Sequence, residues 1–393
     1  NQEADDSALF RPEGCVGVGG DRMPSMRSPL RFRLKRSIEV YPAPDGSVRL
    51  IHEGLGTHFK LEGLSESDHA LLELLQTGFM SREELCDELE RRGLGPGELD
   101  TSLAELTRSG HLEVRASESE LRPSRSERFD RQLIYLSDLC GPGDCGETLQ
   151  ARLAAATVVI LGCGGLGSWA ACGLAGAGIG HLVLVDDDVV ELSNLNRQLL
   201  FRESDIGRPK VEAAADTLAS YDSALRLTAL RERVGSAEDV EALMDGADIL
   251  VATADWPPYE LPRWINRASL STGVPYLGAG QFPPLIRVGP MVIPGRTACH
   301  ECQEARVRSD FPMYEELARF RSSRPSTAST LGAASGIIGS TMAMEIIHHL
   351  TGAVEPATVD RAMVMDLRTL EVEFDPVERH PECECARRPA LIA

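Results

Sequence analysis

The stretch Val158-Val159-Ile160-Leu161-Gly162-Cys163-Gly164-Gly165-Leu166-Gly167-Ser168 decides the fold of the larger part of this chain. An apolar run enters a glycine-rich turn, and the small residues that follow predict a helix. A second apolar run, His181 to Val185, then ends at Asp186-Asp187-Asp188. This is the pattern of a nucleotide-binding strand–helix–strand unit. Its glycines let backbone N–H groups approach phosphate, and an acid about 20 residues further on can bind a ribose.

The region around this unit, Leu153 to Val185, contains no charged side chain and is long enough to span a membrane. Its many Gly and Ala residues, together with His181, favour a buried strand–turn–helix–strand instead. The acidic start, Asn1 to Asp6, does not resemble a signal peptide. A net charge of −20 argues against a nucleic-acid partner. We therefore expect a cytoplasmic protein that binds neither membrane nor nucleic acid.

The length of 393 residues favours two domains. We expect a flexible tail over residues 1–27, a small domain over 28–115, a linker over 116–127 and an α/β domain over 128–393. In the small domain we predict a strand from Leu30 to Tyr41, a hairpin turn at Asp45-Gly46 and a third strand at Thr57 to Leu61. Three leucine-rich helices and a closing strand at His111 to Val114 follow, which suggests an α+β winged helix.

A winged helix usually suggests DNA, but acidic side chains outnumber basic ones in this small domain. Its third helix carries Glu98, Asp100 and Glu105 against Arg108, which is the wrong sign for phosphate. The alternative is capture of an extended peptide, which would add as a strand beside Thr57 to Leu61. An unrelated accessory or dimerisation domain remains open.

Taken alone, the glycine turn suits an NAD oxidoreductase as well as an ATP enzyme. The polar residues downstream favour ATP. Arg197 and Lys210 can neutralise triphosphate oxygens, and Asn194 can hydrogen-bond phosphate or ribose. Asp255 ends another buried strand, where a carboxylate is well placed to hold Mg²⁺.

Four of the ten cysteines are grouped as Cys299-x-x-Cys302 and Cys383-x-Cys385. Grouped thiols in a long chain indicate metal ligands rather than disulfides, with a redox pair as the alternative. Because the second pair is tightly spaced, His300 or His380 could replace one of the thiols as a ligand.

From about residue 128 to 385 the chain resembles the ThiF/MoeB adenylyltransferases, which are relatives of ubiquitin-activating enzymes. The resemblance rests on motifs that occur in the family's order: Arg128-Phe129-Asp130-Arg131-Gln132, Gly162-x-Gly164-Gly165-x-Gly167-Ser168, Asp186-x-Asp188, Ser193-Asn194-Leu195-Asn196-Arg197-Gln198, Gly207-x-Pro209-Lys210-Val211, Asp255 and the cysteine pairs. It implies a Rossmann-like α/β fold with a mixed sheet. In such enzymes a carboxylate attacks the α-phosphate of ATP and releases pyrophosphate.

The resemblance also implies roles for individual residues. Gly162, Gly164, Gly165, Gly167, Asp186 and Asp188 would bind the nucleotide, with Asp186 on the ribose. Asn194, Arg197 and Lys210 would bind the phosphates, and Asp255 would hold Mg²⁺. Arg131 would reach into the ATP site of a partner subunit, which implies a homodimer. Cys299, Cys302, Cys383 and Cys385 would hold a structural Zn²⁺.

Many relatives carry a cysteine in the loop before the helix that we expect from Gly336 to Leu350. Here the sequence from Gln303 to that helix contains none, so a thiolate nucleophile is excluded there. The architecture, a small winged helix in front of a ThiF-like domain, resembles peptide-modifying enzymes of microcin C-type and pantocin-type biosynthesis. Their front domains, called RiPP recognition elements, bind leader peptides.

We therefore expect ATP-dependent adenylation of a ribosomally made precursor peptide whose leader is held by the front domain. Two alternatives stay open. One is a leader-binding partner of a separate cyclodehydratase, and the other is a sulfur-carrier adenylyltransferase.

Overall fold

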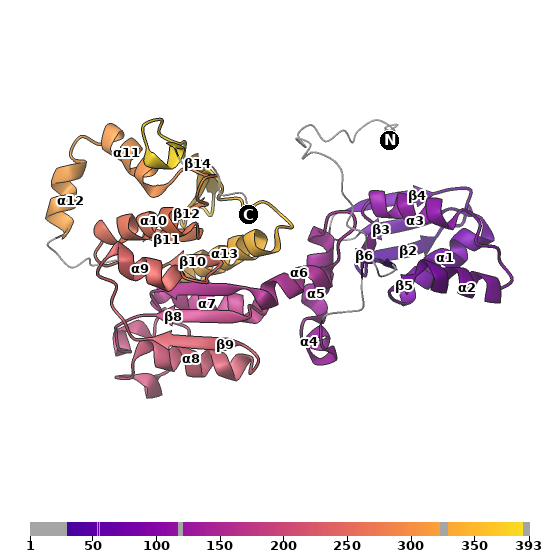
Figure 1. Cartoon of the computed structure of the whole chain (residues 1–393), viewed down its shortest axis with the longest axis horizontal. Helices are drawn as coiled ribbons and strands as arrows, with labels where there is room; N and C mark the ends of the chain where they lie inside the picture. Colours follow the sequence, from indigo (N-terminus) through magenta and orange to yellow (C-terminus); the bar gives the residue numbers. More distant parts are fainter. Residues whose placement is uncertain (1–29, 53, 55, 117–120, 323–328, 388–393) are drawn as a thin grey trace.

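The computed structural model describes residues 30–52, 54, 56–116, 121–322 and 329–387. They form one eight-stranded sheet with helices on both faces and, beside it, a smaller unit with two three-stranded sheets (Figure 1). The tail predicted for residues 1–27 lies outside the described residues.

The smaller unit, which we call the front unit, spans residues 30–115 and has its own leucine-rich core. Its sheets have the orders β5-β1-β6 and β2-β3-β4, and all of the pairings are antiparallel. Its elements are β1 (Arg31–Leu34), β2 (Ile38–Pro42), β3 (Val48–His52), β4 (Thr57–Leu61), α1 (Glu66–Thr77), β5 (Met80–Ser81), α2 (Arg82–Arg91), α3 (Leu99–Arg108) and β6 (Leu112–Arg115).

Local sequence signals explain most of this unit. Ser65 and Ser81 each form a capping box, which satisfies free N–H groups at the starts of α1 and α2. The single strand predicted over Leu30 to Tyr41 is wrong, because a turn at residues 35–37 divides it between the two sheets. Within that turn the N–H of Ile38 donates to the Lys35 carbonyl, so the chain reverses there.

The main sheet has the order β14-β13-β12-β11-β10-β7-β8-β9. Strands β11, β10, β7, β8 and β9 run parallel, and β12, β13 and β14 continue the sheet in antiparallel pairs. The strands are β7 (Thr157–Leu161), β8 (His181–Val185), β9 (Arg226–Leu230), β10 (Ile249–Ala252), β11 (Tyr276–Phe282), β12 (Leu285–Val292), β13 (Arg361–Asp366) and β14 (Val372–Pro376). The α/β class and the mixed sheet predicted from the sequence are confirmed.

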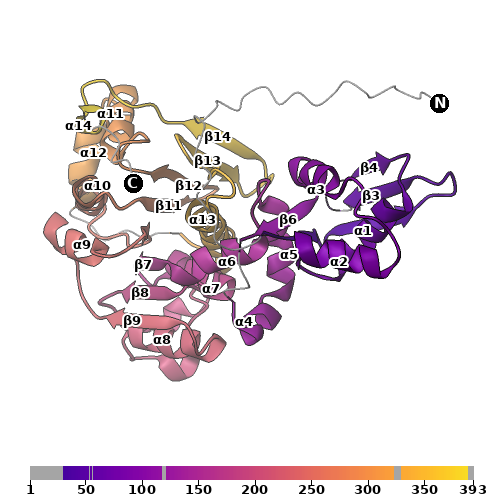
Figure 2. The same cartoon turned by 45° about the vertical axis from the view of Figure 1, so that its right-hand side comes forward.

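Helices cover both faces of this sheet, and each face has its own buried apolar cluster (Figure 2). One cluster includes side chains of α5 to α8 and α13, and the other includes side chains of α9, α10 and α11. The helices are α4 (Pro123–Arg128), α5 (Asp130–Leu139), α6 (Gly146–Ala155), α7 (Gly165–Ala177), α8 (Lys210–Tyr221), α9 (Ala237–Met244), α10 (Glu260–Thr272), α11 (His300–Asp310), α12 (Tyr314–Ser322), α13 (Gly332–Thr351) and α14 (Glu384–Arg387), with 3₁₀ turns η2 (Leu192–Asn194) and η3 (Glu203–Asp205).

Two boundaries differ from those predicted. Helix α4 occupies the second half of the expected linker, and there Arg125 pairs with the buried Asp222. Helix α13 begins at Gly332 rather than Gly336. Among the described residues, no helix is both long and apolar enough to cross a membrane.

Candidate nucleotide and metal sites

The glycine turn lies between β7 and α7, and two of its glycines leave no room for a side chain. Gly162 has a φ of +98°, and a Cβ there would lie 2.5 Å from the backbone nitrogen of Ala254. A Cβ on Gly167 would lie 1.9 Å from the Gly162 carbonyl oxygen. The first turn of α7 carries no acidic side chain. Its free N–H groups and its dipole are therefore suited to a phosphate.

Asp186 ties the glycine turn to the end of β8. One carboxylate oxygen accepts a hydrogen bond from the N–H of Cys163 at 2.7 Å, and the other accepts from the N–H of Asp188 at 2.9 Å. Burial raises the pKa of this carboxyl group above its ordinary value. The carboxylates of Asp186, Asp187 and Asp188 place oxygens within 4.8 Å of one another, an arrangement that could hold a cation.

Three of the predicted phosphate ligands have protein partners. The ammonium of Lys210, which is 6% exposed, lies 2.7 Å from the Asp188 carboxylate. The Arg197 guanidinium donates to the Ser193 carbonyl at 2.8 Å, and a Cβ on Gly165 would lie 3.4 Å from its Cδ. The Asn194 side chain accepts from the N–H of Glu191 and so stabilises turn η2. Arg197 thus lies beside the start of α7, while Asn194 also has a structural task.

Gln198 is a residue to which the sequence reasoning gave no role. It is 3% exposed, and its Oε1 is buried without a hydrogen-bond partner in the described part of the chain. Its Nε2 lies 4.0 Å from the position that a Cβ on Gly164 would occupy. A buried amide oxygen without a donor is costly, so Gln198 fits a donor group of a ligand at the glycine turn. The sequence offered one indication of a role for Gln198, namely its position directly after Arg197.

Asp255 follows a segment that packs on the glycine turn. The Thr253 hydroxyl donates to the Gly162 carbonyl at 2.7 Å, and the N–H of Ala254 donates to the Leu161 carbonyl at 2.8 Å. Asp255 is exposed, as a ligand for a metal–nucleotide complex must be. A separate cavity of about 350 Å³ between α10 and α12 is lined by Glu260, whose Oε2 has no partner among the described residues.

The start of α13 completes this edge of the sheet. A Cβ on Gly332 would lie 2.5 Å from the Asn196 carbonyl, and the Ser335 hydroxyl lies 3.1 Å from the Cβ position of Gly165. Trp169 on α7 donates to the Arg197 carbonyl at 3.1 Å. The structure therefore brings the glycine turn, the Arg197 segment and the start of α13 together. All three come from separate parts of the sequence.

Arg131 is the predicted site residue that lies apart from this edge. It is exposed on α5, and its neighbour Gln132 donates to the Ala177 carbonyl at the end of α7. The glycine turn is at the other end of that helix, which has 13 residues. At 1.5 Å per residue the separation is about 20 Å, beyond the reach of an arginine side chain. Arg131 is therefore too far away to serve the glycine turn of its own chain.

The four grouped cysteines converge although the two pairs are distant in sequence. The Sγ–Sγ distances are 3.8 Å for Cys299–Cys302, 3.5 Å for Cys299–Cys383 and 3.3 Å for Cys302–Cys385. All four sulfurs lie within 4.8 Å of one another and form no disulfide. Tetrahedral Zn–S bonds of about 2.3 Å place sulfurs roughly 3.8 Å apart, so the thiols fit a Zn²⁺ ion. The cluster needs no histidine ligand.

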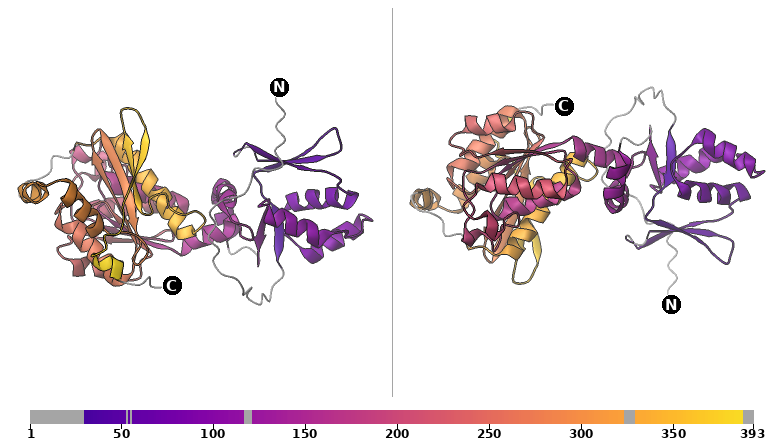
Figure 3. Two further views of the ribbon diagram at one scale, coloured as in Figure 1. Left: turned by 90° about the horizontal axis from the view of Figure 1, so that it is seen from above. Right: turned by 90° about the horizontal axis from the view of Figure 1, so that it is seen from below.

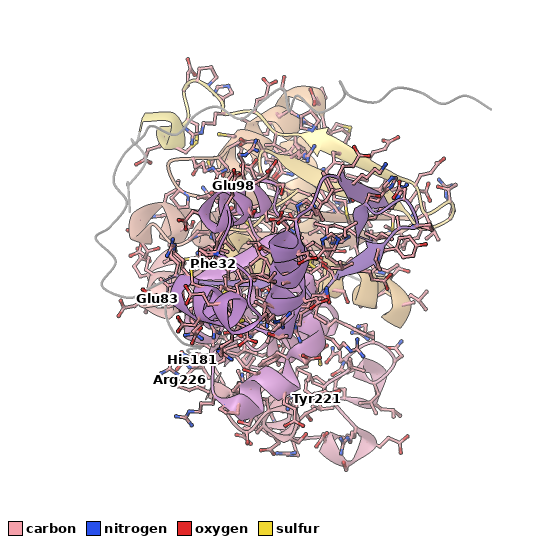
Figure 4. The ribbon with its side chains drawn as sticks, turned by 90° about the vertical axis from the view of Figure 1, so that its right-hand side faces the viewer. Phe32, Glu83, Glu98, His181, Tyr221 and Arg226 are labelled. Carbon is pink, nitrogen blue, oxygen red and sulfur yellow. The ribbon has the colours of Figure 1, made fainter. Side chains whose placement is uncertain are left out.

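The exposed surface of the front unit carries acidic side chains on its helices. Glu83 on α2 and Glu98 at the start of α3 are exposed on the end of the molecule that faces the viewer in Figure 4. Acidic side chains on these helices would repel a phosphate backbone.

Comparisons with known proteins agree with this geometry. The sequence profile of the ThiF family matches residues 130–385. The chain is 34% identical to the sulfur carrier protein ThiS adenylyltransferase of Escherichia coli, over 58% of this chain and 83% of that protein. It is 30% identical to the molybdopterin-synthase adenylyltransferase of Escherichia coli, over 68% of this chain and 98% of that protein.

Among solved structures, Escherichia coli MccB with ATP has a TM-score of 0.67 at 23% identity, covering 90% of this chain and 99% of that chain. MccB has also been solved as the microcin C7 biosynthetic enzyme in complex with N-formylated MccA, with a TM-score of 0.67 at 22% identity and the same coverage. The shared fold includes the front unit. The profile match and the two curated relatives identify the chain as a member of the ThiF family and an adenylyltransferase that uses ATP.

Proposed function

We propose that this adenylyltransferase activates a ribosomally made precursor peptide whose leader is held by the front unit. A carboxylate or amide-derived group of the peptide attacks the α-phosphate of ATP, and pyrophosphate leaves. The observation that carries the chemistry is the convergence of the glycine turn, Arg197 and the start of α13 at one edge of the sheet. Such a site needs no nucleophilic side chain, because positioning and charge neutralisation at the phosphates are sufficient.

Each nucleotide-site residue then has a task. Arg197 and Lys210 neutralise phosphate charge, and Lys210 can exchange its contact with the exposed Asp188 for a phosphate oxygen. Asp186 accepts a ribose hydroxyl, and Gln198 offers its free Oε1 to a donor group of the nucleotide or peptide. Asp255 would hold Mg²⁺, which supplies charge neutralisation at the phosphates. Cys299, Cys302, Cys383 and Cys385 would hold a structural Zn²⁺.

The front unit offers an edge where a peptide can bind. Among the described residues, strand β4 pairs with β3 alone, and four of its five residues are exposed. An extended peptide can add there as a further antiparallel strand and gain backbone hydrogen bonds. Phe59 of β4 packs edge-on against His111, directly before β6, so the strand is anchored on its other face. MccB, which has the same overall fold, was solved in complex with MccA.

The fate of the adenylate follows from the sequence between α11 and α13. No cysteine lies between Gln303 and Leu331, so this segment cannot take the acyl group as a thioester. We propose that a nucleophile of the same peptide closes a ring or bond, or that AMP is retained on the product.

A second candidate is adenylation of a sulfur-carrier protein, because one relative is named as the adenylyltransferase of the sulfur carrier protein ThiS. The front unit and the missing cysteine favour the peptide instead. A leader-binding partner of a cyclodehydratase, which need not use ATP, is disfavoured by the retained Arg197, Lys210 and Asp255.

The direct test is pyrophosphate release with synthetic peptides encoded next to the gene. We expect release with one such peptide and a loss of at least about 100-fold in the Arg197→Ala and Asp255→Ala variants. Arg226→Ala is the matched control, because Arg226 contacts His181 at the start of β8, the opposite end from the glycine turn (Figure 4). Release with a ThiS-like carrier protein and with none of the peptides would establish the second candidate instead.

The homodimer has its own test, since Arg131 would have to serve the partner's nucleotide site. Neither Arg131→Ala nor Arg197→Ala chains should release pyrophosphate efficiently alone. Mixed together, they form hybrid dimers with one intact site, so activity should return to about a quarter of wild type. If the mixture stays inactive while wild-type dimers remain active, Arg131 does not act across an interface.

A further inference from the structure

Helix α5, which carries Arg131, is held by the front unit at both of its ends. Arg36, in the turn between β1 and β2, forms an ion pair with the Asp130 carboxylate and also donates to the Asp130 carbonyl at 3.1 Å. Near the other end of α5, Asp138 accepts from the Ser37 hydroxyl at 2.5 Å, and the His52 Nε2 lies 3.1 Å from the same carboxylate. The turn between β1 and β2 and the end of β3 therefore contact both ends of α5.

The turn between β1 and β2 is held in place by hydrogen bonds within the front unit. The N–H of Lys35 donates to the His111 carbonyl at 2.9 Å, which joins the turn to the residue before β6. On the far side of the turn, β2 pairs along its whole length with β3, the strand that ends at His52. The contacts to α5 therefore come from a rigid support rather than from a free loop.

A second set of contacts fixes the next helix, α6. Glu113 of β6 is 1% exposed, and its carboxylate accepts from the N–H of Gly146 at the start of α6 and from Arg33. Arg115 pairs with Glu147 at 2.5 Å. Figure 3 shows from two sides that the helices between the two parts of the molecule form the junction between them. The front unit is thus docked against α5 and α6 together.

The geometry of α5 links this docking to Arg131. Arg131 directly follows Asp130 and precedes Asp138 by seven residues, so Arg131 and Asp138 lie within about 20° of each other around the helix. Any rotation of α5 that redirects Arg131 would break the contacts of Asp138. Arg131 itself is exposed, and its side chain is therefore accessible to another subunit.

We propose that the front unit sets the direction of Arg131, so that the unit that binds peptide also shapes the nucleotide site of the partner subunit. Arg36, Ser37, Asp130 and Asp138 are the positioning residues. This inference rests on the proposed role of Arg131 across the dimer. An exposed ion pair contributes little to stability, so the contact of Arg36 with Asp130 affects position more than folding. A displacement of about 1 Å at a reacting group can cost about 100-fold in rate.

The test is a double-mutant cycle with α,β-methylene ATP, a probe that needs no peptide. Its Kd is measured by calorimetry for the full-length dimeric wild type and for the Arg36→Ala, Arg131→Ala and doubly substituted chains. We expect Arg131→Ala to weaken binding about tenfold and Arg36→Ala about threefold to fivefold, with the double variant no weaker than Arg131→Ala alone. Melting temperature and sedimentation should stay as in wild type, and Arg36→Lys should recover part of the loss.

The control is Arg82→Ala, which breaks another exposed arginine–aspartate pair within the front unit, to Asp100. It should leave the Kd unchanged. If the losses from Arg36→Ala and Arg131→Ala multiply, or if Arg36→Ala changes nothing, the positioning role is wrong while nucleotide binding stands. If wild type binds the analogue and Arg131→Ala leaves its Kd unchanged, both the positioning role and the trans arginine are wrong. A wild-type chain that fails to bind the analogue overturns the proposed function as well.

Discussion

The nucleotide edge and the thiol cluster are built in opposite ways. At the nucleotide edge most polar side chains already have protein partners, such as Asp186 with two backbone N–H groups and Lys210 with Asp188. In the cluster, the sulfurs of Cys299 and Cys383 come from positions 84 residues apart and contact mainly other sulfurs. The first site can therefore form without its ligand. In the second, clustered thiolates would repel one another, so a bound cation should contribute strongly to the fold.

The largest effect should come from the thiol cluster. Replacing Cys299 and Cys302 with serine should remove bound zinc and cost at least about 5 kcal/mol, because structural zinc binding is coupled to folding. Thermal unfolding and metal analysis of the purified chain measure this. Cys172→Ser is the control, since Cys172 lies on α7 outside the cluster. If the purified chain holds no stoichiometric metal and the double variant melts like wild type, the thiol cluster does not depend on a metal. The two sites would then not differ in their need for a ligand.

The next largest effect should come from the glycine turn. Gly162→Ala forces a side chain onto a φ of +98° and to within 2.5 Å of the Ala254 nitrogen, so we expect destabilisation by about 3 kcal/mol. Gly176→Ala is the matched control, because Gly176 is in α7 with open space around it and should be stabilised by up to about 1 kcal/mol. Denaturant unfolding compares the two. Equal stabilities would show that the turn is not preformed.

A smaller effect is expected from the contact that joins the turn to β10. Thr253→Val keeps the shape of the side chain but removes the hydrogen bonds from its hydroxyl to the Gly162 and Leu161 carbonyls. We expect a loss of about 1–2 kcal/mol in unfolding free energy. The backbone N–H groups of Thr253 and Ala254 still serve the Leu161 carbonyl, which limits the loss. A loss as large as that for Gly162→Ala would indicate that the hydroxyl, not the backbone, holds the turn.

The smallest effect concerns the pH dependence of ATP binding. Burial raises the pKa of Asp186, so on acidification this carboxylate takes up its proton at a higher pH than an ordinary aspartate. ATP affinity should be full above the raised pKa and fall as the pH drops through it, because the neutral acid is the weaker acceptor for a ribose hydroxyl. Asp186→Asn should bind ATP about fivefold to tenfold more weakly and without this step. Calorimetry across the acidic range measures both, and a parallel pH profile for the variant would assign the step to another group.

The glycine turn was predictable because the residues that form it are consecutive in the sequence. The run from Val158 to Ser168 carries its strand, turn and helix start, and the acid at Asp186 follows at the expected distance. The cysteine cluster was predictable from spacing alone, since short Cys-x-x-Cys and Cys-x-Cys pairs already place two sulfurs side by side.

Other features depend on contacts between distant residues and could not be predicted in this way. The division of residues 30–41 between two sheets depends on pairing of β1 with β6, which is remote in sequence. Strand β9 gives little signal in the sequence, because it lies at the edge of the main sheet and none of its residues is fully buried. The free Oε1 of Gln198 becomes visible only when its surroundings are known. The distance between Arg131 and the glycine turn of the same chain can be inferred only when the length and direction of α7 are known.

One edge of β4 has no partner strand in the part of the chain that the structure describes, and this has a consequence for handling the protein. A strand with unpaired backbone groups is a template for pairing with any other extended chain, including a partly unfolded copy of this protein. Lys60 within β4, held between Asp45 and Glu62, places charge on this edge and should weaken such contacts. Concentrated samples should therefore be most prone to aggregate at high salt, where this charge is screened.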